Sequence, residues 1–193
     1  PGVISIADDI IVFGDSPASH NDHLHGLMQR AQQYGLVFNK SKRIIGSTEV
    51  PFFGHIYSSA GIRPDPAKIQ AIKNLAEPAD VKALRTFLGM VTYLSDHVPN
   101  LSDATTCLRQ LLKDENEFQW HSEHSQAFRK IQQLICDAST LAYFDPAKQS
   151  VIQVDASQEA LGAAILQDNR IIAYASKSLS DTEKRYANIE REL

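Results

Sequence analysis

Apolar residues at the start of the chain form short runs that predict β-strands. Residues 3–6 and 10–13 are mostly apolar, and the acidic pair Asp8 and Asp9 lies between them. Two such runs around a short polar break are typical of a hairpin, which places both acids at its tip. Asp is a common turn residue, but two carboxylates at a rigid tip can also hold a divalent cation. The pattern alone leaves both interpretations open.

The hydrophobic period then changes to that of a helix. Apolar residues recur at helical spacing between residues 24 and 31, Ser16 is placed to cap the helix, and Gly35 is placed to end it. The next segments, "LVFNKSK" and "VPFFGHIYS", alternate or cluster as strands do. The sequence "SSAG" is expected to form the turn that follows them.

Helices are predicted for the middle of the chain. Asp65 and Asp80 are placed to cap two of them. Two more are expected in "LSDATTCLRQLLKD" and "HSEHSQAFRKIQQLICDA", with Trp120 and Phe128 as core anchors. The predicted apolar face of the helix after Asp80 consists of Leu84, Phe87, Leu88 and Val91.

From residue 150 the period returns to that of strands. The runs "VIQVDAS", "LGAAILQ" and "RIIAYAS" predict an antiparallel meander with turns at "QEA" and "DN". Ser180 and Glu183 match a capping box, which predicts a helix that continues to the end of the sequence. Because three strands and one helix bury little surface, we expect this part to be a piece of a larger domain.

Composition describes an ordinary globular protein and excludes several classes. The 193 residues are 43% hydrophobic and 22% charged, and no apolar run is long enough to span a membrane. No leader peptide is visible, and two cysteines are too few for a disulfide framework, so an intracellular setting is expected. The histidines near residues 20–25 and 121–124 lack further ligands at metal-binding spacing, so no zinc site is predicted.

Charge gives only a weak indication of a binding partner. The net charge of −4 differs from the basic balance typical of nucleic-acid-binding domains. Between residues 63 and 85, however, basic residues outnumber acidic ones. This local excess fits either a solvated helix face or a phosphate-binding surface.

The order of the motifs resembles one family, the Pol polyprotein of gypsy-type LTR retroelements. The resemblance extends over essentially the whole chain, from the reverse transcriptase palm into ribonuclease H. It rests on six segments in the expected order: "ADDIIVF", "GLVFNKSK", "FFGHIYSSAGIRPDPAKIQAI", "LRTFLGMVTYL", "FQWHSEHSQAF" and "VDASQEALGAAILQ" with the residues that follow it.

The resemblance implies an α+β fold in three parts. Residues 1–62 correspond to the second half of the polymerase palm with its metal-binding hairpin. Residues 63–140 correspond to the thumb and connection helices, and residues 141–193 to a truncated ribonuclease H-like domain of three strands and a first helix. The implied function is RNA-directed DNA synthesis with hydrolysis of RNA in hybrids.

For the palm, the resemblance implies a set of catalytic residues. Asp8 and Asp9 correspond to the aspartates that bind the catalytic metals, Asp8 being the surer ligand. Lys42, with Lys40 as its competitor, corresponds to the lysine that protonates the leaving pyrophosphate; a solvated loop lysine is the alternative. The family commonly has Tyr two places before the first aspartate, where this chain has Ile6.

Contacts with nucleic acid are implied for two further segments. Phe53, Gly54 and His55 correspond to the primer grip, a turn against the primer end in which Gly54 allows close backbone approach. The residues that would contact phosphates from the thumb, without reading sequence, are Arg63, Lys68, Lys82 and Arg85.

The last segment resembles the start of ribonuclease H. Asp155 corresponds to the metal-binding aspartate of the first strand, with a turn acid at the end of a strand as the alternative. Glu192 corresponds to the next acid of the site, with Glu190 as its rival, and the two carboxylates are expected to approach closely. Gly162 fits a strand position that needs close packing.

The resemblance also implies the cofactor and the partners. Two Mg²⁺ or Mn²⁺ ions would serve each reaction. Partners would be primer–template duplex, RNA/DNA hybrid, deoxynucleoside triphosphates and the remainder of the polyprotein, in a cytoplasmic retroelement particle with access to the nucleus. We expect this piece to be inactive alone; the alternative is a non-catalytic nucleic-acid-binding or scaffold protein derived from such an element.

Overall fold

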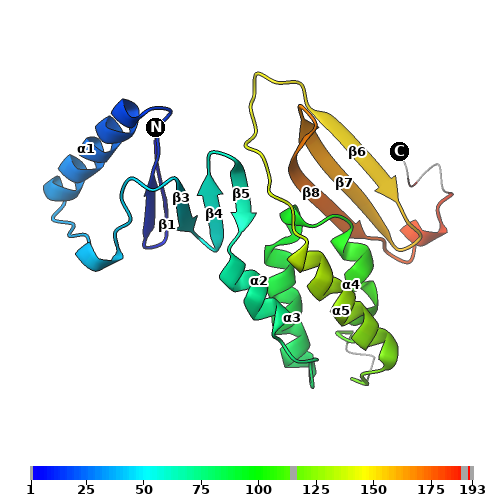
Figure 1. The fold of residues 1–193 in the computed structure, drawn as a ribbon. Helices are drawn as coiled ribbons and strands as arrows, with labels where there is room; N and C mark the ends of the chain where they lie inside the picture. The colour runs from blue at the N-terminus through cyan, green and yellow to red at the C-terminus, as the bar shows by residue number, and fades with distance from the viewer. Residues whose placement is uncertain (1, 114–116, 188–190, 192–193) are drawn as a thin grey trace. The chain divides into compact units, whose positions relative to one another are not determined.

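A computed structural model describes residues 2–113, 117–187 and 191. The chain divides into two compact units, one ending at Ser59 and one beginning at Ala60, and each is described by itself (Figure 1). Within the described ranges, every helix is too short or too polar to cross a membrane.

The first unit begins with the predicted hairpin and helix. Strands β1 (Val3–Ile6) and β2 (Asp9–Val12) pair antiparallel. Helix α1 (Pro17–Gln33) starts at a capping box formed by Ser16 and Ser19, and Gly35 follows its end with a φ of +68°. The strand–turn–strand prediction and both helix ends are confirmed.

The strand predicted for "LVFNKSK" is wrong. This segment contains a short 3₁₀ helix, η1 (Lys40–Lys42), in place of a strand. The Asn39 side chain accepts hydrogen bonds from the Ser41 amide at 3.0 Å and from the Ser41 hydroxyl at 2.8 Å. This local side-chain bonding stabilises a turn where no strand is available to pair, and Val37 is left 94% exposed.

The strands predicted for "VPFFGHIYS" are confirmed as a second hairpin. Strand β3 (Glu49–Phe52) pairs antiparallel with β4 (His55–Ser58). Phe53 and Gly54 form the turn, both with positive φ. This backbone is typical of tight two-residue hairpins, whose twist matches that of the strands.

The second unit starts with a short strand and two helices whose acidic caps were predicted. Strand β5 (Gly61–Pro64) leads into α2 (Pro66–Lys73) and α3 (Val81–Tyr93). The Asp65 carboxylate accepts from the Ala67 amide at 2.8 Å, and the Asp80 carboxylate accepts from the Ala83 amide at 2.7 Å. Both caps are confirmed.

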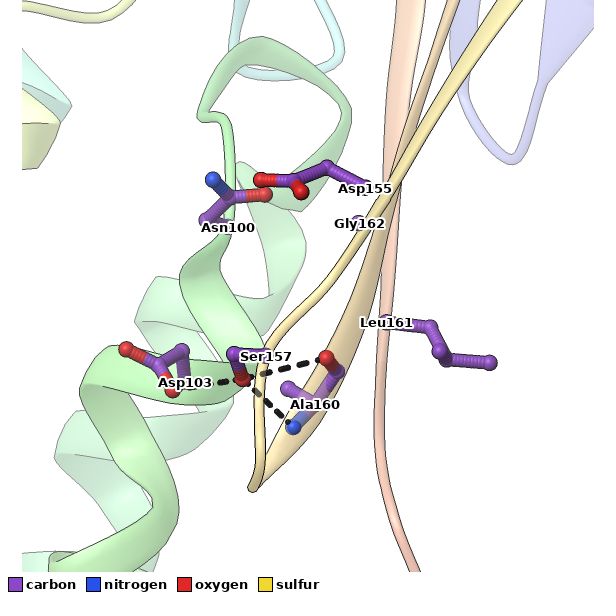
Figure 2. Close-up of a pocket in the computed structure, with 7 residues that line it drawn as sticks. All are labelled: Asn100, Asp103, Asp155, Ser157, Ala160, Leu161 and Gly162. Carbon is purple, nitrogen blue, oxygen red and sulfur yellow. Dashed lines mark hydrogen bonds between the residues drawn. The ribbon is translucent and has the colours of Figure 1, made fainter. Parts of the chain in front are cut away.

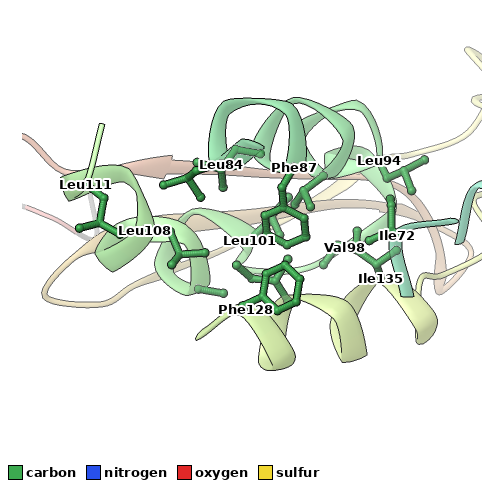
Figure 3. Packing of buried hydrophobic residues seen from close by; sticks show 14 residues of the cluster. Ile72, Leu84, Phe87, Leu94, Val98, Leu101, Leu108, Leu111, Phe128 and Ile135 are labelled. Carbon is green, nitrogen blue, oxygen red and sulfur yellow. The ribbon is translucent and has the colours of Figure 1, made fainter. Parts of the chain in front are cut away.

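The remaining helices complete one hydrophobic core. After η2 (Ser95–His97) come α4 (Leu101–Gln110) and α5 (Ser122–Cys136). Phe87 of α3 and Phe128 of α5 pack with ring centroids 4.6 Å apart (Figure 3). The predicted apolar face of α3 is buried, and Trp120 packs against the cluster with partial exposure. This core explains why the four helices stay together.

The predicted meander is confirmed as a three-stranded sheet. Strands β6 (Val151–Ala156), β7 (Ala160–Gln167) and β8 (Arg170–Ser178) pair antiparallel in chain order. The turn between β7 and β8 consists of Asp168 and Asn169, both with positive φ. Asp and Asn tolerate this backbone region better than most residues.

Helix α4 joins the helical core to the sheet. One side buries Leu101 and Leu108 in the core. The other side contacts β7 and β8, where the Ser176 hydroxyl accepts from the Ser102 amide at 3.0 Å. That bond satisfies a first-turn amide that the side chain of Asn100, the N-cap residue, leaves unbonded.

The helix predicted after the meander differs at its start. Ser180 and Glu183 do form the reciprocal contacts of a capping box. The element that follows is, however, a 3₁₀ helix, η3 (Glu183–Arg185), rather than an α-helix. Glu183 is also bonded to Lys177 of β8 at 2.6 Å, so its carboxylate is shared between strand and cap. Glu190 and Glu192 lie outside the described residues.

Candidate functional site

The acidic pair of the first unit lies at the tip of the β1–β2 hairpin. Ala7 and Asp8 form the turn, and Asp9 begins β2 opposite Ile6. Both carboxylates are exposed, and Ala7 has a φ of +49°. The structure therefore presents two adjacent carboxylates to solvent on a short, tightly turned backbone, an arrangement suited to a hard cation.

The predicted lysine lies on a separate turn of the same unit. Lys40 and Lys42 are the two ends of η1, and both are exposed. Within the part of the chain that the structure describes, Lys42 makes no ion pair with Asp8 or Asp9. The structure does not bring these groups together, so the role of Lys42 stays a prediction.

The predicted primer grip is the turn of the β3–β4 hairpin. The Phe53 carbonyl lies 3.1 Å from Nδ1 of His55, and the Phe53 ring is 48% exposed. A non-glycine residue with φ of +47° costs about 1 kcal/mol. The strained turn thus holds an aromatic ring at the surface, next to a glycine that leaves the backbone accessible.

The four predicted phosphate contacts lie along the start of the second unit. Arg63 is half-buried in β5, whereas Lys68 on α2 and Lys82 and Arg85 on α3 are exposed. Lys82 and Arg85 are three residues apart on the helix, so they share one face of α3. Their side chains are accessible to an anionic partner.

Asp155 lies near the end of β6, beside a small cavity. Figure 2 shows its carboxylate pointing toward the Asn100 carboxamide at the start of α4. The cavity is about 60 Å³ and is also lined by Asp103, Ser157 and Gly162. Its side-chain polar atoms are mainly oxygens, the atom type that Mg²⁺ and Mn²⁺ prefer. The type of these atoms therefore suits a hard divalent cation, for which Asp155 supplies one carboxylate.

Hydrogen bonds hold the turn after Asp155 against α4. The Ser157 hydroxyl donates to the Asp103 carboxylate at 3.1 Å and accepts from the Ala160 amide at 2.9 Å (Figure 2). Nη1 of Arg191 donates to the Ser157 carbonyl at 2.9 Å. The turn that follows Asp155 is thus bonded to two other segments, through the Ser157 side chain and the Ser157 carbonyl.

Gly162 lies directly opposite Asp155 in the β6–β7 ladder. A Cβ atom at this position would lie 2.0 Å from Oδ1 of Asn100. Only glycine lets the carboxamide sit against the strand, so the predicted need for close packing is confirmed.

Sequence reasoning missed Asn100, Asp103 and Ser157. Asn100 and Asp103 lie more than 50 positions before Ser157 in the chain. The one sequence signal for them was an Asn and an Asp three residues apart at the start of a predicted helix. In the described ranges, no three His, Cys, Asp or Glu side chains converge on one point. The approach of Asp155 to Glu192 stays a prediction, since Glu192 lies outside those ranges.

The sequence of this chain is similar to the sequences of known proteins. Residues 120–193 match the model of the RNase H-like domain found in reverse transcriptase. Over nearly its whole length the chain is similar to retroelement Pol polyproteins. It is 33% identical over 190 residues to the retrovirus-related Pol polyprotein from transposon 297 of Drosophila melanogaster. It is 29% identical over 196 residues to the transposon Tf2-3 polyprotein of Schizosaccharomyces pombe.

These matches cover nearly all of this chain but only a small part of each polyprotein. They cover 96% and 99% of this chain but only 18% and 15% of the two polyproteins. The chain therefore spans less than a fifth of the curated relatives it matches.

Solved structures with the same fold are viral reverse transcriptases. A foamy viral protease-reverse transcriptase in complex with double-stranded DNA is similar with a TM-score of 0.90 at 24% identity, over 100% of this chain and 35% of that chain. A foamy viral protease-reverse transcriptase in complex with RNA/DNA hybrid gives a TM-score of 0.88 at 24% identity, over 100% and 27%. The mixed α/β fold is thereby confirmed at the level of an RNase H-like domain.

Proposed function

We propose that this chain is part of an RNA-directed DNA polymerase with ribonuclease H of a gypsy-type retrotransposon. Its first residues would form part of the palm, the helices from α2 to α5 the thumb and connection, and the meander the start of ribonuclease H. The observation that carries the proposal is Asp155, which lies beside an oxygen-lined cavity in the segment that matches the RNase H-like family.

The ribonuclease H reaction would depend on Asp155. Mg²⁺ or Mn²⁺, when bound, would supply an activated water and stabilise the leaving oxygen. Asp155 would hold the cation together with Glu192, and Glu190 is the rival for that second position. Asp103 would orient the turn after Asp155 through its bond to Ser157. Asn100 would fill the space between Gly162 and the carboxylate.

DNA synthesis would depend on the hairpin tip. Asp8 and Asp9 would hold the cations that position a nucleotide triphosphate and a primer end. Lys42 would protonate the departing pyrophosphate, and the turn at Phe53 and Gly54 would contact the primer. Residues outside this chain would complete both sites, so we expect the chain alone neither to extend a primer nor to cut a hybrid.

Primer–template duplex and RNA/DNA hybrid would be the nucleic-acid partners. The similar foamy viral structures were obtained with double-stranded DNA and with RNA/DNA hybrid, which supports this choice. Phosphate contacts from α2 and α3 would position the duplex without reading its sequence. Deoxynucleoside triphosphates and the remainder of the polyprotein would be further partners, in a cytoplasmic retroelement particle with access to the nucleus.

The test separates the two sites in a longer Pol protein that contains this chain. Asp155→Asn is expected to abolish hybrid cleavage and leave primer extension intact, and Asp8→Asn is expected to do the reverse. Asp168→Asn is the control, because Asp168 is an exposed turn acid bonded to Lys148. Full cleavage by the Asp155 variant would overturn its assignment.

A second pair of variants decides which glutamate is the second ligand. The activities of the longer protein then test the alternative, non-catalytic function. Glu192→Gln is expected to stop hybrid cleavage, whereas Glu190→Gln is not; the opposite result would make Glu190 the ligand. A longer protein that binds duplex but shows neither activity would favour a non-catalytic scaffold derived from such an element.

A further inference from the structure

A second polar groove lies at the far end of α4 from Asp155. Thr106, Arg109 and Lys113 line it from α4 and the turn after it, and Ser178, Ser180 and Lys184 line it from the end of β8 and the segment that follows. The first turn of α4 is bonded to the sheet. The groove is about 310 Å³, enough for a group of nucleotide size.

The cations of this groove differ in how far they are already neutralised. Lys184 is bonded to the Glu159 carboxylate, so its charge is largely compensated. Arg109 is held by hydroxyls instead: its Nε donates to Thr105 at 3.2 Å and its Nη2 to Thr92 at 3.5 Å. Among the described residues, no carboxylate pairs with Arg109 or with Lys113.

The described negative groups of the groove carry less charge than Arg109 and Lys113 together. Among the lining residues that the structure describes, Asp181 is the one acid, and it is exposed. The C-terminal end of α4 adds about half a negative charge. Among the described lining residues, Arg109 and Lys113 therefore outweigh Asp181 and the helix end, and this part of the groove is attractive to an anion.

We propose that this groove binds the phosphate backbone of a nucleic acid, with Arg109 and Lys113 on separate phosphates. The Arg109 guanidinium has five N–H donors, of which the two hydroxyl contacts use two, and its planar fork matches phosphate oxygens. Its orientation by two threonines reduces the freedom lost on binding. The inference rests on the proposed nucleic-acid function and adds a contact surface distinct from Arg63, Lys68, Lys82 and Arg85.

The experiment measures duplex binding by the full 193-residue chain. The probe is a fluorescently labelled 18-base-pair DNA duplex, and anisotropy is recorded over a series of salt concentrations. The double variant Arg109→Gln/Lys113→Gln is expected to bind about 10-fold more weakly at low salt, with a log–log salt slope lower by about 2. Lys113→Gln alone, at an exposed position, is expected to lower the slope by about 1.

The matched control removes the same charge elsewhere. Lys73→Gln/Lys130→Gln changes two exposed residues, one of α2 and one of α5, that do not line the groove and form no ion pair with a described carboxylate. The log–log salt slope of this control variant is expected to fall by less than half of the decrease expected for Arg109→Gln/Lys113→Gln. Equal losses in both double variants would show an effect of net charge only and would overturn the inference. Unchanged Trp120 fluorescence would confirm that each variant is folded.

Three further outcomes are informative. Wild-type chain that does not bind duplex would contradict both the nucleic-acid function and the groove. Wild-type binding that the double variant retains would contradict the groove alone. If dATP or polyglutamate binds through Arg109 and Lys113 while duplex binding is unaffected, the groove serves a free nucleotide or an acidic protein, and the inference is wrong.

Discussion

Gln167 is a buried polar side chain whose removal should destabilise the second unit by a predictable amount. It is 3% exposed. Its Oε1 accepts from the Asp145 amide at 2.9 Å, and its Nε2 donates to the carbonyls of Asp145 at 2.9 Å and Lys148 at 3.3 Å and to the Ser150 hydroxyl at 3.1 Å. One carboxamide thus bonds the last part of the loop before β6, from Asp145 to Ser150.

The expected loss of stability follows from the number of hydrogen bonds that the Gln167 carboxamide makes. An amide nitrogen has two hydrogens, so its three acceptors count as two bonds, and the bond to Oε1 makes three. At about 1 kcal/mol net for each, Gln167→Ala should lower the free energy of unfolding by about 3 kcal/mol. With an m-value of about 2 kcal/mol/M, the urea midpoint should fall by about 1.5 M.

The assay is urea unfolding followed by the fluorescence of Trp120, the single tryptophan. Trp120 lies beside the helical core, so a shift caused by a sheet residue also shows that helices and sheet unfold together. Gln133→Ala is the control, because Gln133 is exposed and its Nε2 bonds to Asp137 at 2.8 Å. A midpoint change below about 0.3 M for Gln167→Ala would refute the reasoning.

Gln167→Glu tests the donor separately. The new carboxylate oxygen would face two carbonyls, which raises the pKa of that carboxyl in the folded state. Stability should therefore be highest at low pH and should decrease as pH rises through the folded-state pKa. A variant whose unfolding midpoint, relative to wild type, is the same at every pH would contradict the donor assignment.

Three other features give shorter predictions. Gly162→Ala should cost about 2 kcal/mol because its Cβ would lie 2.0 Å from Asn100, and Asn100→Ala should restore most of that loss in a double-mutant cycle. The hydrogen bond from Lys177 lowers the pKa of Glu183 to about 2. The contribution of the ionised Glu183 carboxylate to folding stability is therefore complete above the ordinary pKa of 4.5 and is lost as pH falls toward 2. NMR titration of this carboxylate measures its pKa, and a titration midpoint near 4.5 would contradict the prediction. Burial raises the pKa of the Cys107 thiol. Iodoacetamide should alkylate it more slowly in the folded chain than in urea, and equal rates would exclude the effect.

Local signals in the sequence were sufficient for most of the secondary structure. Asp65 and Asp80 cap their helices because each carboxylate reaches an amide two or three residues ahead, and this spacing is visible in the sequence. The strand predicted for "LVFNKSK" failed for a related reason. Asn39 offers the backbone a bonded turn, while a strand needs a partner that the pattern cannot supply.

The surroundings of Asp155 could be predicted only in part. The resemblance of the "VDAS" segment indicated Asp155, and a glycine within a predicted strand indicated close packing at Gly162. Asn100 and Asp103 contact this region from a helix more than 50 positions earlier in the chain, and no local period encodes that distance. Such contacts arise from the packing of α4 on the sheet.

Helix α4 also has a mechanical consequence. It is bonded to the turn after Asp155 through Asp103, to β8 through Ser102, and to the helical core through Leu101 and Leu108. Force applied to the helices by a bound duplex would therefore be transmitted along α4 to the backbone beside Asp155. A displacement of the helices is therefore expected to move the backbone beside Asp155 with them.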